Sequence, residues 1–183
     1  RVFSAWVKGV DERPAPTPFG DKLPFGECLA EYESSGWVHE VAWSPSGNRL
    51  AFVGHDSSVT FIDAPNTQQR LTLSTLPFRS LAFLSENTIA AAGHDCNPAI
   101  FNAAGSAWSF TKFVDEEKKA AAAGGANAMS MWQQKVDLGT TSNETTLSTK
   151  HQNAVSNLQP VGGAPGRVTS FSTSAVDGKL VIW

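Results

Sequence analysis

Two pairs of adjacent histidine and aspartate residues are the first places in this sequence where chemistry could occur. His55-Asp56 and His94-Asp95 hold the same position in two similar stretches, GHDSSVTFID and GHDCNPAIFN. Imidazole nitrogens and carboxylate oxygens are common metal ligands, and both groups serve as acids and bases in enzymes. Cys96 follows the second pair directly and would add a thiolate. The most specific function that these residue types suggest is therefore a metal site or a hydrolytic centre.

A repeat along the chain offers a simpler explanation for these pairs. Asp56 and Asp95 are thirty-nine residues apart, and Asp177 holds the same position in a third stretch, AVDGKLVIW. Five and six residues after each aspartate stands an apolar pair: Phe61–Ile62, Ile100–Phe101 and Ile182–Trp183. No cluster of further ligands accompanies the aspartates, so we interpret them as turn residues whose carboxylates accept backbone N–H groups. A metal site or an active site at these turns is the less favoured hypothesis.

Short alternating strands and polar turns surround these three positions. The pattern predicts a first four-strand unit at residues 37–44, 49–54, 59–64 and 68–73. It predicts a second four-strand unit at residues 79–84, 88–92, 99–103 and 107–114. Three further strands are predicted at residues 151–161, 167–176 and 179–183. Residues 162–166, GGAPG, read as the turn inside the last group, and residues 1–7 and 27–34 read as strands before the first. Antiparallel four-strand units repeated every forty residues or so are the blades of a β-propeller. We therefore expect residues 1–183 to be all-β and to form part of one propeller.

Two stretches interrupt the repeat. Residues 11–26 hold four prolines and two glycines, which excludes a central strand and predicts a long surface loop, with Phe19 and Phe25 as possible anchors. Residues 115–150 begin with a charged and alanine-rich run and end in a polar Ser/Thr tract, which predicts a flexible insertion.

One segment inside the insertion, at residues 128–138, has partial helical spacing of its apolar residues. Such a helix either packs on its own propeller or binds a partner with a bulky aromatic anchor. The residues that would form this partner-binding arm are Met129, Met131, Trp132, Lys135 and Val136.

Composition excludes several classes of function. The net charge is −3 and no run of Lys or Arg could follow a phosphate backbone, so we expect no nucleic-acid partner. No apolar run is long enough to span a membrane. No phosphate-binding, dinucleotide-binding or nucleophile-elbow motif occurs, so we expect no cofactor and no enzymatic activity. The two cysteines, Cys28 and Cys96, are expected to be buried thiols in the reducing cytoplasm.

The last unit carries a set of side chains that is typical of WD40 blades. His151, Thr173, Asp177 and Trp183 stand where a WD40 repeat has its His, Ser/Thr, Asp and Trp, which can hydrogen-bond through the blade. In the two earlier units Phe52 and Ala91 take the Ser/Thr position, and Ile62 and Phe101 take the Trp position. The earlier units are thus degenerate versions of the same repeat.

Four stretches carry a more specific resemblance: ERPAPTPFGDKLPFGE, WVHEVAWSPSGNRLAFVGHDSSV, IAAAGHDCNPAIF and AVDGKLVIW. They resemble the WD40 subunit, subunit 1, of the actin-related protein 2/3 complex, and the proline-rich connector and the AAGHDC turn are not general WD40 features. The resemblance implies a seven-bladed propeller of which this chain is the C-terminal half, and the departures in the insertion suggest a fungal member.

The resemblance also implies a function and a set of partners. It implies a non-catalytic scaffold that supports nucleation of branched actin filaments, in the cytoplasm at cortical patches of the actin cytoskeleton. The partners would be the other subunits of the complex, the actin filament, which the arm at 128–138 would approach, and the acidic tail of nucleation-promoting factors. Basic residues that could receive such a tail are Arg13, Lys22, Arg49, Arg79, Lys118 and Lys119. A generic WD40 interaction adaptor and a propeller hydrolase remain the alternatives.

Overall fold

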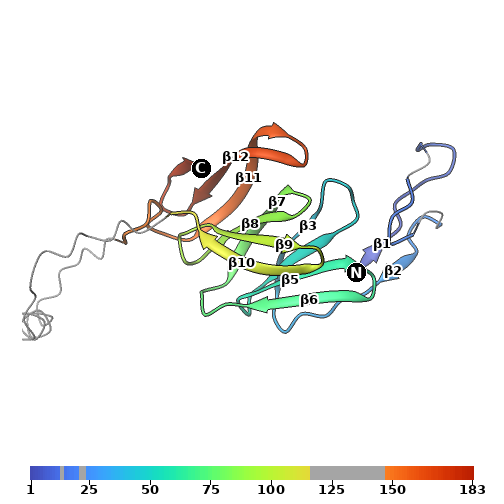
Figure 1. The fold of residues 1–183 in the computed structure, drawn as a ribbon, viewed down its shortest axis with the longest axis horizontal. Helices are drawn as coiled ribbons and strands as arrows, with labels where there is room; N and C mark the ends of the chain where they lie inside the picture. Colours follow the sequence, from blue (N-terminus) through green and yellow to red (C-terminus); the bar gives the residue numbers. More distant parts are fainter. Residues whose placement is uncertain (13–14, 21–23, 116–146) are drawn as a thin grey trace, which may run out of the picture.

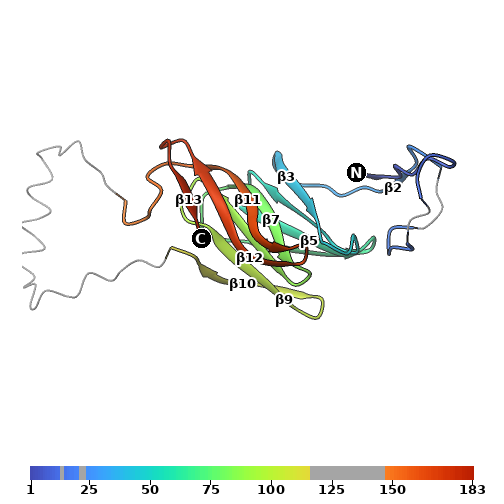
Figure 2. The same ribbon diagram turned by 90° about the horizontal axis from the view of Figure 1, so that it is seen from above.

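The computed structural model describes residues 1–12, 15–20, 24–115 and 147–183 (Figure 1). Within these ranges every regular element is a β-strand, and there are thirteen of them. The strands form antiparallel sheets that lie side by side, as Figures 1 and 2 show. The prediction of an all-β fold consistent with part of a WD40 propeller is therefore confirmed.

The first blade-like sheet has four strands in the order in which the chain meets them. The strands are β3 (Val38–Trp43), β4 (Leu50–Gly54), β5 (Ser58–Ala64) and β6 (Thr67–Thr72). Their boundaries lie within one or two residues of those that the alternation predicts. The turn between β3 and β4 contains Gly47 with φ of +73°, a conformation that glycine adopts without steric cost.

The second sheet repeats this order, and the third follows it with three strands. The second consists of β7 (Phe78–Ser85), β8 (Thr88–Gly93), β9 (Ala99–Ala104) and β10 (Ala107–Phe113). The third consists of β11 (Val155–Ala164), β12 (Arg167–Ala175) and β13 (Leu180–Ile182). A single residue pair, Arg167 at the start of β12 with Ser85 at the end of β7, links the third sheet to the second. β3, β7 and β11 are therefore the first strands of three successive units, and we call them the inner strands.

Alternate residues of a strand point to opposite faces, and this creates a hydrophobic layer between each pair of neighbouring sheets. The first layer lies between the β3–β6 and β7–β10 sheets and contains Ala51, Val53, Val59 and Phe61 from one side and Leu81, Phe83, Ala91, Phe101 and Trp108 from the other. The second layer lies between the β7–β10 and β11–β13 sheets and contains Ala82, Ala90, Ala92, Val155, Leu158 and Phe171. Burial of these two layers is the main force that holds the sheets together.

The N-terminal segments cover the remaining face of the first sheet. β1 (Val2–Phe3) and β2 (Cys28–Ala30) form a small two-stranded sheet, and both strands are shorter than the predicted ranges 1–7 and 27–34. Phe19 is 7% exposed and meets the Trp43 ring edge-on at 5.1 Å, whereas Phe25 is 70% exposed. Phe19 is thus an anchor of the proline-rich connector, and the prediction that Phe25 is another was wrong.

Two further predictions need correction. The turn expected at residues 162–166 is shorter, because Gly162 and Gly163 still pair with Ser170 and Val168 and β11 continues to Ala164. Small residues allow this close strand pairing, since a Cβ on Gly163 would lie 2.2 Å from the carbonyl oxygen of Arg167. Cys28 was expected to be buried but is exposed, and only Cys96 is buried.

The predicted arm helix at 128–138 lies outside the described residues. Its five named residues, Met129, Met131, Trp132, Lys135 and Val136, fall in the range 116–146 and stay a prediction.

Candidate functional site

The WD40-type side chains of the last sheet form one connected hydrogen-bond network. Trp183 Nε1 donates to Thr173 Oγ1 at 2.8 Å, and His151 Nε2 lies 2.7 Å from the same hydroxyl. Because an indole nitrogen can only donate, the Thr173 hydroxyl accepts from Trp183 and is free to donate to His151. A His151 ring that accepts at Nε2 carries its proton on Nδ1, which lies 3.4 Å from both carboxylate oxygens of Asp177. His151 and Thr173 are fully buried, so the network holds the interior of the sheet together.

Asp177 connects this network to the backbone of two segments. Its carboxylate accepts the N–H of Gln152 at 2.7 Å and the N–H of Lys179 at 2.9 Å. Burial alone would raise the pKa of Asp177, but these two amides and His151 outweigh it and lower the pKa. A carboxylate held ionised by its structural partners is a poor proton acceptor, which favours a structural role over acid–base chemistry.

The aspartates of the two earlier turns also accept backbone N–H groups. Asp56 Oδ1 accepts from the Ser58 N–H at 3.2 Å, and its other oxygen pairs with the guanidinium of Arg70. Asp95 Oδ2 accepts from the Leu76 N–H at 2.9 Å. Burial opposes the ionised form of Asp56, but the Ser58 hydroxyl and Arg70 outweigh it and lower its pKa. The three aspartates therefore share a position in the turn and differ in the groups that they bind.

The residue after each aspartate adopts the same unusual backbone conformation. Ser57, Cys96 and Gly178 have φ values of +60°, +61° and +77°, in the left-handed region. This region is routine for glycine and uncommon for serine or cysteine. The three turns therefore share a left-handed residue directly after the aspartate although their sequences differ.

The geometry around Cys96 does not resemble an active nucleophile or a metal ligand. Its Sγ donates to the carbonyl oxygen of His94, 3.5 Å away, in the same turn. Burial, followed by the nearby charge of Asp95, raises the pKa of the Cys96 thiol, so the thiolate is disfavoured. Among the described residues, no group of three or more His, Cys, Asp and Glu side chains is arranged to hold a metal ion.

Three histidines from two neighbouring sheets lie close together, at the end of the sheets that carries the β4–β5 and β8–β9 turns. His39 Nε2 lies 2.9 Å from His55 Nδ1, and the ring centroids of His55 and His94 are 6.3 Å apart. Trp37, which is 76% exposed, lies over His55 with 5.2 Å between the ring centroids. We call these four residues, together with the exposed Arg79, the histidine surface.

Sequence reasoning did not find the histidine surface, because it grouped each histidine with the aspartate beside it. The missed signal is that His39 and Arg79 hold equivalent positions near the start of β3 and β7. The strand pairing places His39 beside the turn that contains His55, and Arg79 beside the turn that contains His94. Burial lowers the pKa of His39, and the neighbouring His55, Arg79 and His94 lower it further. The His39 ring is therefore mostly neutral at neutral pH and gains positive charge as the pH falls below 6.5.

Of the basic residues considered from the sequence, only Arg79 is available at a described surface. Arg49 is occupied inside the protein: it donates to the Asn87 side chain at 2.8 Å and lies 3.4 Å from the carboxylate of Asp63 and 5.6 Å from the centroid of the Trp108 ring. It joins the first two sheets and is not free to receive a ligand. Arg13, Lys22, Lys118 and Lys119 lie outside the described residues.

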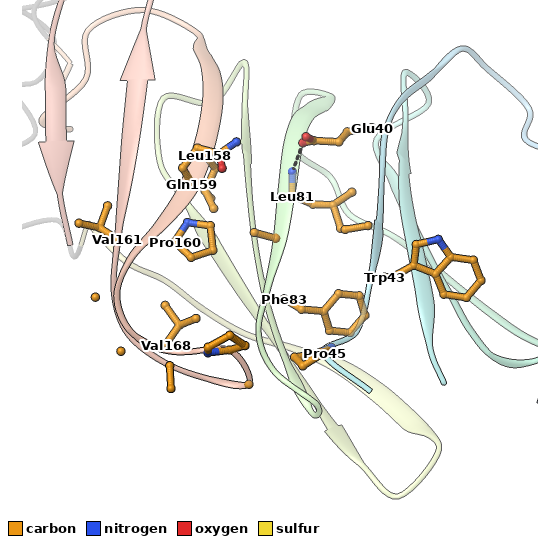
Figure 3. A pocket seen from close by; sticks show the side chains of 17 residues that line it. Glu40, Trp43, Pro45, Leu81, Phe83, Leu158, Gln159, Pro160, Val161 and Val168 are labelled. Carbon is orange, nitrogen blue, oxygen red and sulfur yellow. Dashed lines mark hydrogen bonds between the residues drawn. The ribbon is translucent and has the colours of Figure 1, made fainter. Parts of the chain in front are cut away.

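A cavity of about 540 Å³ lies between the three inner strands β3, β7 and β11 (Figure 3). Its described lining is mostly apolar, and Glu40 is the one titratable side chain in it. The Glu40 carboxylate is engaged, because Oε2 accepts the backbone N–H of Leu81 at 2.6 Å. A hydrolase needs a paired acid and base or a nucleophile beside a base, and this lining supplies neither.

The comparisons with known proteins agree on one relationship. No family model matches the chain. The chain is 41% identical over 191 residues to "Actin-related protein 2/3 complex subunit 1A-A" of Xenopus laevis. It is 37% identical over 204 residues to subunit 1 of the same complex in Schizosaccharomyces pombe, and 36% identical over 197 residues to subunit 1B in Arabidopsis thaliana.

These alignments cover all of this chain and about half of each relative. The covered shares of the relatives are 51%, 54% and 52% in the same order. The resemblance to subunit 1 of the actin-related protein 2/3 complex is therefore confirmed along the whole of the present sequence. Within the described residues no helix is long and apolar enough to cross a membrane.

Proposed function

We propose that this chain forms part of a non-catalytic subunit of the actin-related protein 2/3 complex and supports the nucleation of branched actin filaments. The observation that carries the proposal is the similarity of the entire chain to subunit 1 proteins from an animal, a fungus and a plant. The subunit would act with the other subunits of the complex in the actin cytoskeleton, at cortical patches. The WD-repeat scaffold supplies surfaces and positions partners, and no chemical step is assigned to it.

The described interior supports a scaffold. The carboxylates of the three turns accept structural hydrogen bonds, and the described lining of the cavity between the inner strands holds no acid–base pair. The carboxylates that could act as bases are stabilised in their ionised forms at Asp56 and Asp177. These features argue against the propeller hydrolase that the sequence left open.

Co-purification tests the assignment to the complex. The full-length protein that contains this chain, carrying an affinity tag, should be recovered from its own cells together with actin-related proteins 2 and 3. Recovery with ubiquitin-ligase components and without actin-related proteins would favour the generic adaptor instead. Tagging at either terminus of the full-length protein controls for a tag that blocks assembly.

The arm at 128–138 is proposed to reach the actin filament. Its sequence, AMSMWQQKVDL, places an aromatic residue and two methionines inside a polar stretch, which is a composition typical of a binding segment. Replacement of Trp132 by Ala should reduce branch formation by the purified complex at least tenfold, because a central aromatic anchor contributes about 2 kcal/mol or more. Gln133→Ala is the matched control. Equal branching by both variants, with the complex intact, would remove the arm from the mechanism.

The histidine surface is proposed to receive the acidic tail of nucleation-promoting factors. Arg79 is exposed and lies close enough to His39 to lower its pKa, and the His39 ring gains positive charge as the pH falls below 6.5. An acidic segment would be attracted to this charge, and Trp37 offers an adjacent apolar contact.

Binding of an acidic tail peptide to the purified complex tests this surface. Arg79→Ala should weaken binding about two- to fivefold, since an exposed ion pair contributes up to about 1 kcal/mol. Arg167→Ala, at another exposed arginine, is the control and should leave affinity unchanged. Binding by wild type should also strengthen as the pH falls below 6.5, where His39 becomes protonated, and weaken with added salt. A loss of affinity equal in both variants would assign the effect to net charge alone.

A further inference from the structure

The chain contains two places where a proline directly follows a residue with a hydroxyl group. Of its ten prolines, only Pro18 and Pro45 follow a serine or threonine, at Thr17 in the proline-rich connector and at Ser44 directly after β3. Proline-directed protein kinases select such pairs, because a proline has no backbone N–H that the kinase would have to satisfy. On sequence alone, both hydroxyls are equal candidates for phosphorylation.

The structure distinguishes the two hydroxyls by their burial and hydrogen bonds. Ser44 is 4% exposed, and its Oγ donates to Glu86 Oε1 at 2.9 Å and accepts the Arg49 N–H at 3.1 Å. Thr17 is half-buried, and its neighbours on both sides are exposed. A kinase binds the residues around the hydroxyl as an extended segment. At Ser44 this would disrupt the first sheet, whereas at Thr17 only a short surface segment has to open. Thr17 is therefore the accessible member of the pair.

A small turn holds Thr17 in place and positions a buried ring. Thr17 Oγ1 donates to the carbonyl oxygen of Gly20 at 3.1 Å, and the Phe19 N–H donates to the same Oγ1 at 3.3 Å. The Gly20 N–H donates to the carbonyl oxygen of Thr17 at 3.0 Å and closes the turn. Phe19 thereby contacts Trp43 and the apolar cluster on the first sheet. The burial of Phe19 is thus coupled to the hydrogen bonds of the Thr17 hydroxyl.

We propose that Thr17 is a phosphorylation site for a proline-directed kinase, and that its phosphorylation releases Phe19 from the first sheet. In the transfer, Thr17 Oγ1 forms a bond to the γ-phosphorus of ATP and the bond from that phosphorus to ADP breaks, while the hydroxyl proton passes to the catalytic base of the kinase. The esterified oxygen can no longer donate to Gly20, and a group with a charge of about −1.5 to −2 would lie beside that carbonyl oxygen. Both changes favour the open turn.

Opening of the turn and phosphorylation favour each other. Burial of Phe19 opposes opening, so it limits the fraction of molecules that a kinase can use. By the same equilibrium, a phosphate that favours the open turn weakens the burial of Phe19. Opening would expose Trp43 further, together with the apolar cluster under the Phe19 ring. The site therefore controls access to an apolar surface, and the inference does not depend on the proposed role in actin nucleation.

Phosphorylation of the full-length protein, purified from its own cells, tests the site. The protein is incubated with ATP and either a cyclin-dependent or a mitogen-activated kinase, and the phosphate is mapped by mass spectrometry. Thr17 should be modified and Ser44 should not, whereas both should be modified after denaturation. Thr17→Ala should lose this phosphate and Thr17→Ser should regain it. Absence of phosphate from Thr17 with both kinases, or equal modification of Ser44 in the folded protein, would overturn the proposal.

Two phenylalanines of the connector test the coupling to the buried ring. Phe19→Ala should raise the initial rate of Thr17 phosphorylation about threefold or more, because the turn opens more often. Phe25→Ala is the matched control, since Phe25 is 70% exposed, and it should leave the rate unchanged. Ser44 should stay unmodified in both variants, which shows that the first sheet remains folded. Equal rates in the two variants would overturn the coupling.

Hydrogen exchange measures the release of the ring directly. Phosphorylation of Thr17 should accelerate exchange of the Phe19 and Gly20 amides about three- to tenfold, the equivalent of one lost hydrogen bond. Thr17→Val removes the hydroxyl without adding charge and should accelerate their exchange less. Unchanged exchange in the phosphorylated protein would overturn the release. Slower exchange would overturn it as well, because it would mean that a basic group holds the phosphate in the closed turn.

Discussion

The β3–β6 and β11–β13 sheets share one backbone plan and fill their interiors in different ways. In the last sheet, Thr173 and Trp183 belong to a buried polar network with His151. In the first sheet, Phe52 and Ile62 take the corresponding positions and pack against the N-terminal segments as part of an apolar cluster. The comparison teaches that the turn and strand geometry does not depend on the polar network. The positions of Thr173 and Trp183 can therefore be filled by apolar side chains or by members of a satisfied hydrogen-bond network, since a partly satisfied buried network is costly.

Removal of one side chain destabilises the apolar layer and the polar network for different physical reasons. In an apolar layer a truncated side chain leaves a cavity, and its cost follows the volume that is lost. In the polar network a removed hydroxyl leaves two buried nitrogen groups without partners. The following changes are arranged from the largest expected effect to the smallest, and each would be measured by denaturant unfolding of the full-length protein.

Phe61→Ala should have the largest effect. The Phe61 ring is 1% exposed and stacks on Trp108 with 4.4 Å between centroids, so the change removes the centre of the first layer. We expect the free energy of unfolding to fall by about 3–5 kcal/mol. Phe25→Ala, at a ring that is 70% exposed, is the matched control and should change it by less than about 0.5 kcal/mol. Similar losses in both would mean that the first layer does not hold the sheets together.

Thr173→Val should have an intermediate effect. Valine has nearly the same shape but leaves His151 Nε2 and Trp183 Nε1 without their shared hydroxyl, at an expected cost of about 1–3 kcal/mol. Thr169→Val on the same strand is the control, because Thr169 is exposed. If Thr173→Val were neutral or stabilising, the last sheet would tolerate an apolar interior as readily as the first does.

Asp56→Asn should have the smallest of the three effects at neutral pH, and that effect should disappear in acid. The pKa of Asp56 is lowered in the folded protein, so its carboxylate stabilises the fold above the ordinary aspartate pKa of 3.8. This contribution is lost as the pH falls below 3.8 and through the folded-state value. The difference in unfolding free energy between wild type and variant should therefore shrink across that range. Parallel pH profiles would show that Ser58 and Arg70 do not stabilise the ionised form.

Most of the fold could be predicted from the sequence because alternation and turn residues act locally. The three aspartate positions set the phase of the strands, and β3 to β10 follow the predicted ranges closely. The end of β11 could not be predicted, because two adjacent glycines usually indicate a turn. Gly162 and Gly163 instead pair with β12, where the close approach of the two strands leaves no room for a Cβ at Gly163.

The candidate surfaces were harder to predict than the strands. The meeting of His39, His55 and His94 depends on how two sheets lie beside each other, which no local pattern encodes. The exposure of Cys28 and Phe25 likewise depends on which face of the N-terminal sheet is covered. The network of His151, Thr173, Asp177 and Trp183 had a recognisable spacing, which is why those residues could be named together from the sequence.

The left-handed position after each turn aspartate has a practical consequence for labelling. Glycine already occupies this position at 178, with φ in the same left-handed region as Cys96. Cys96→Gly should therefore preserve the left-handed turn conformation and remove the strain that a side chain has there. Of the two cysteines of this chain, the exposed Cys28 would then remain as the single attachment point for a thiol-reactive dye. A fluorophore there would sit beside the proline-rich connector and report on its contacts with the first sheet.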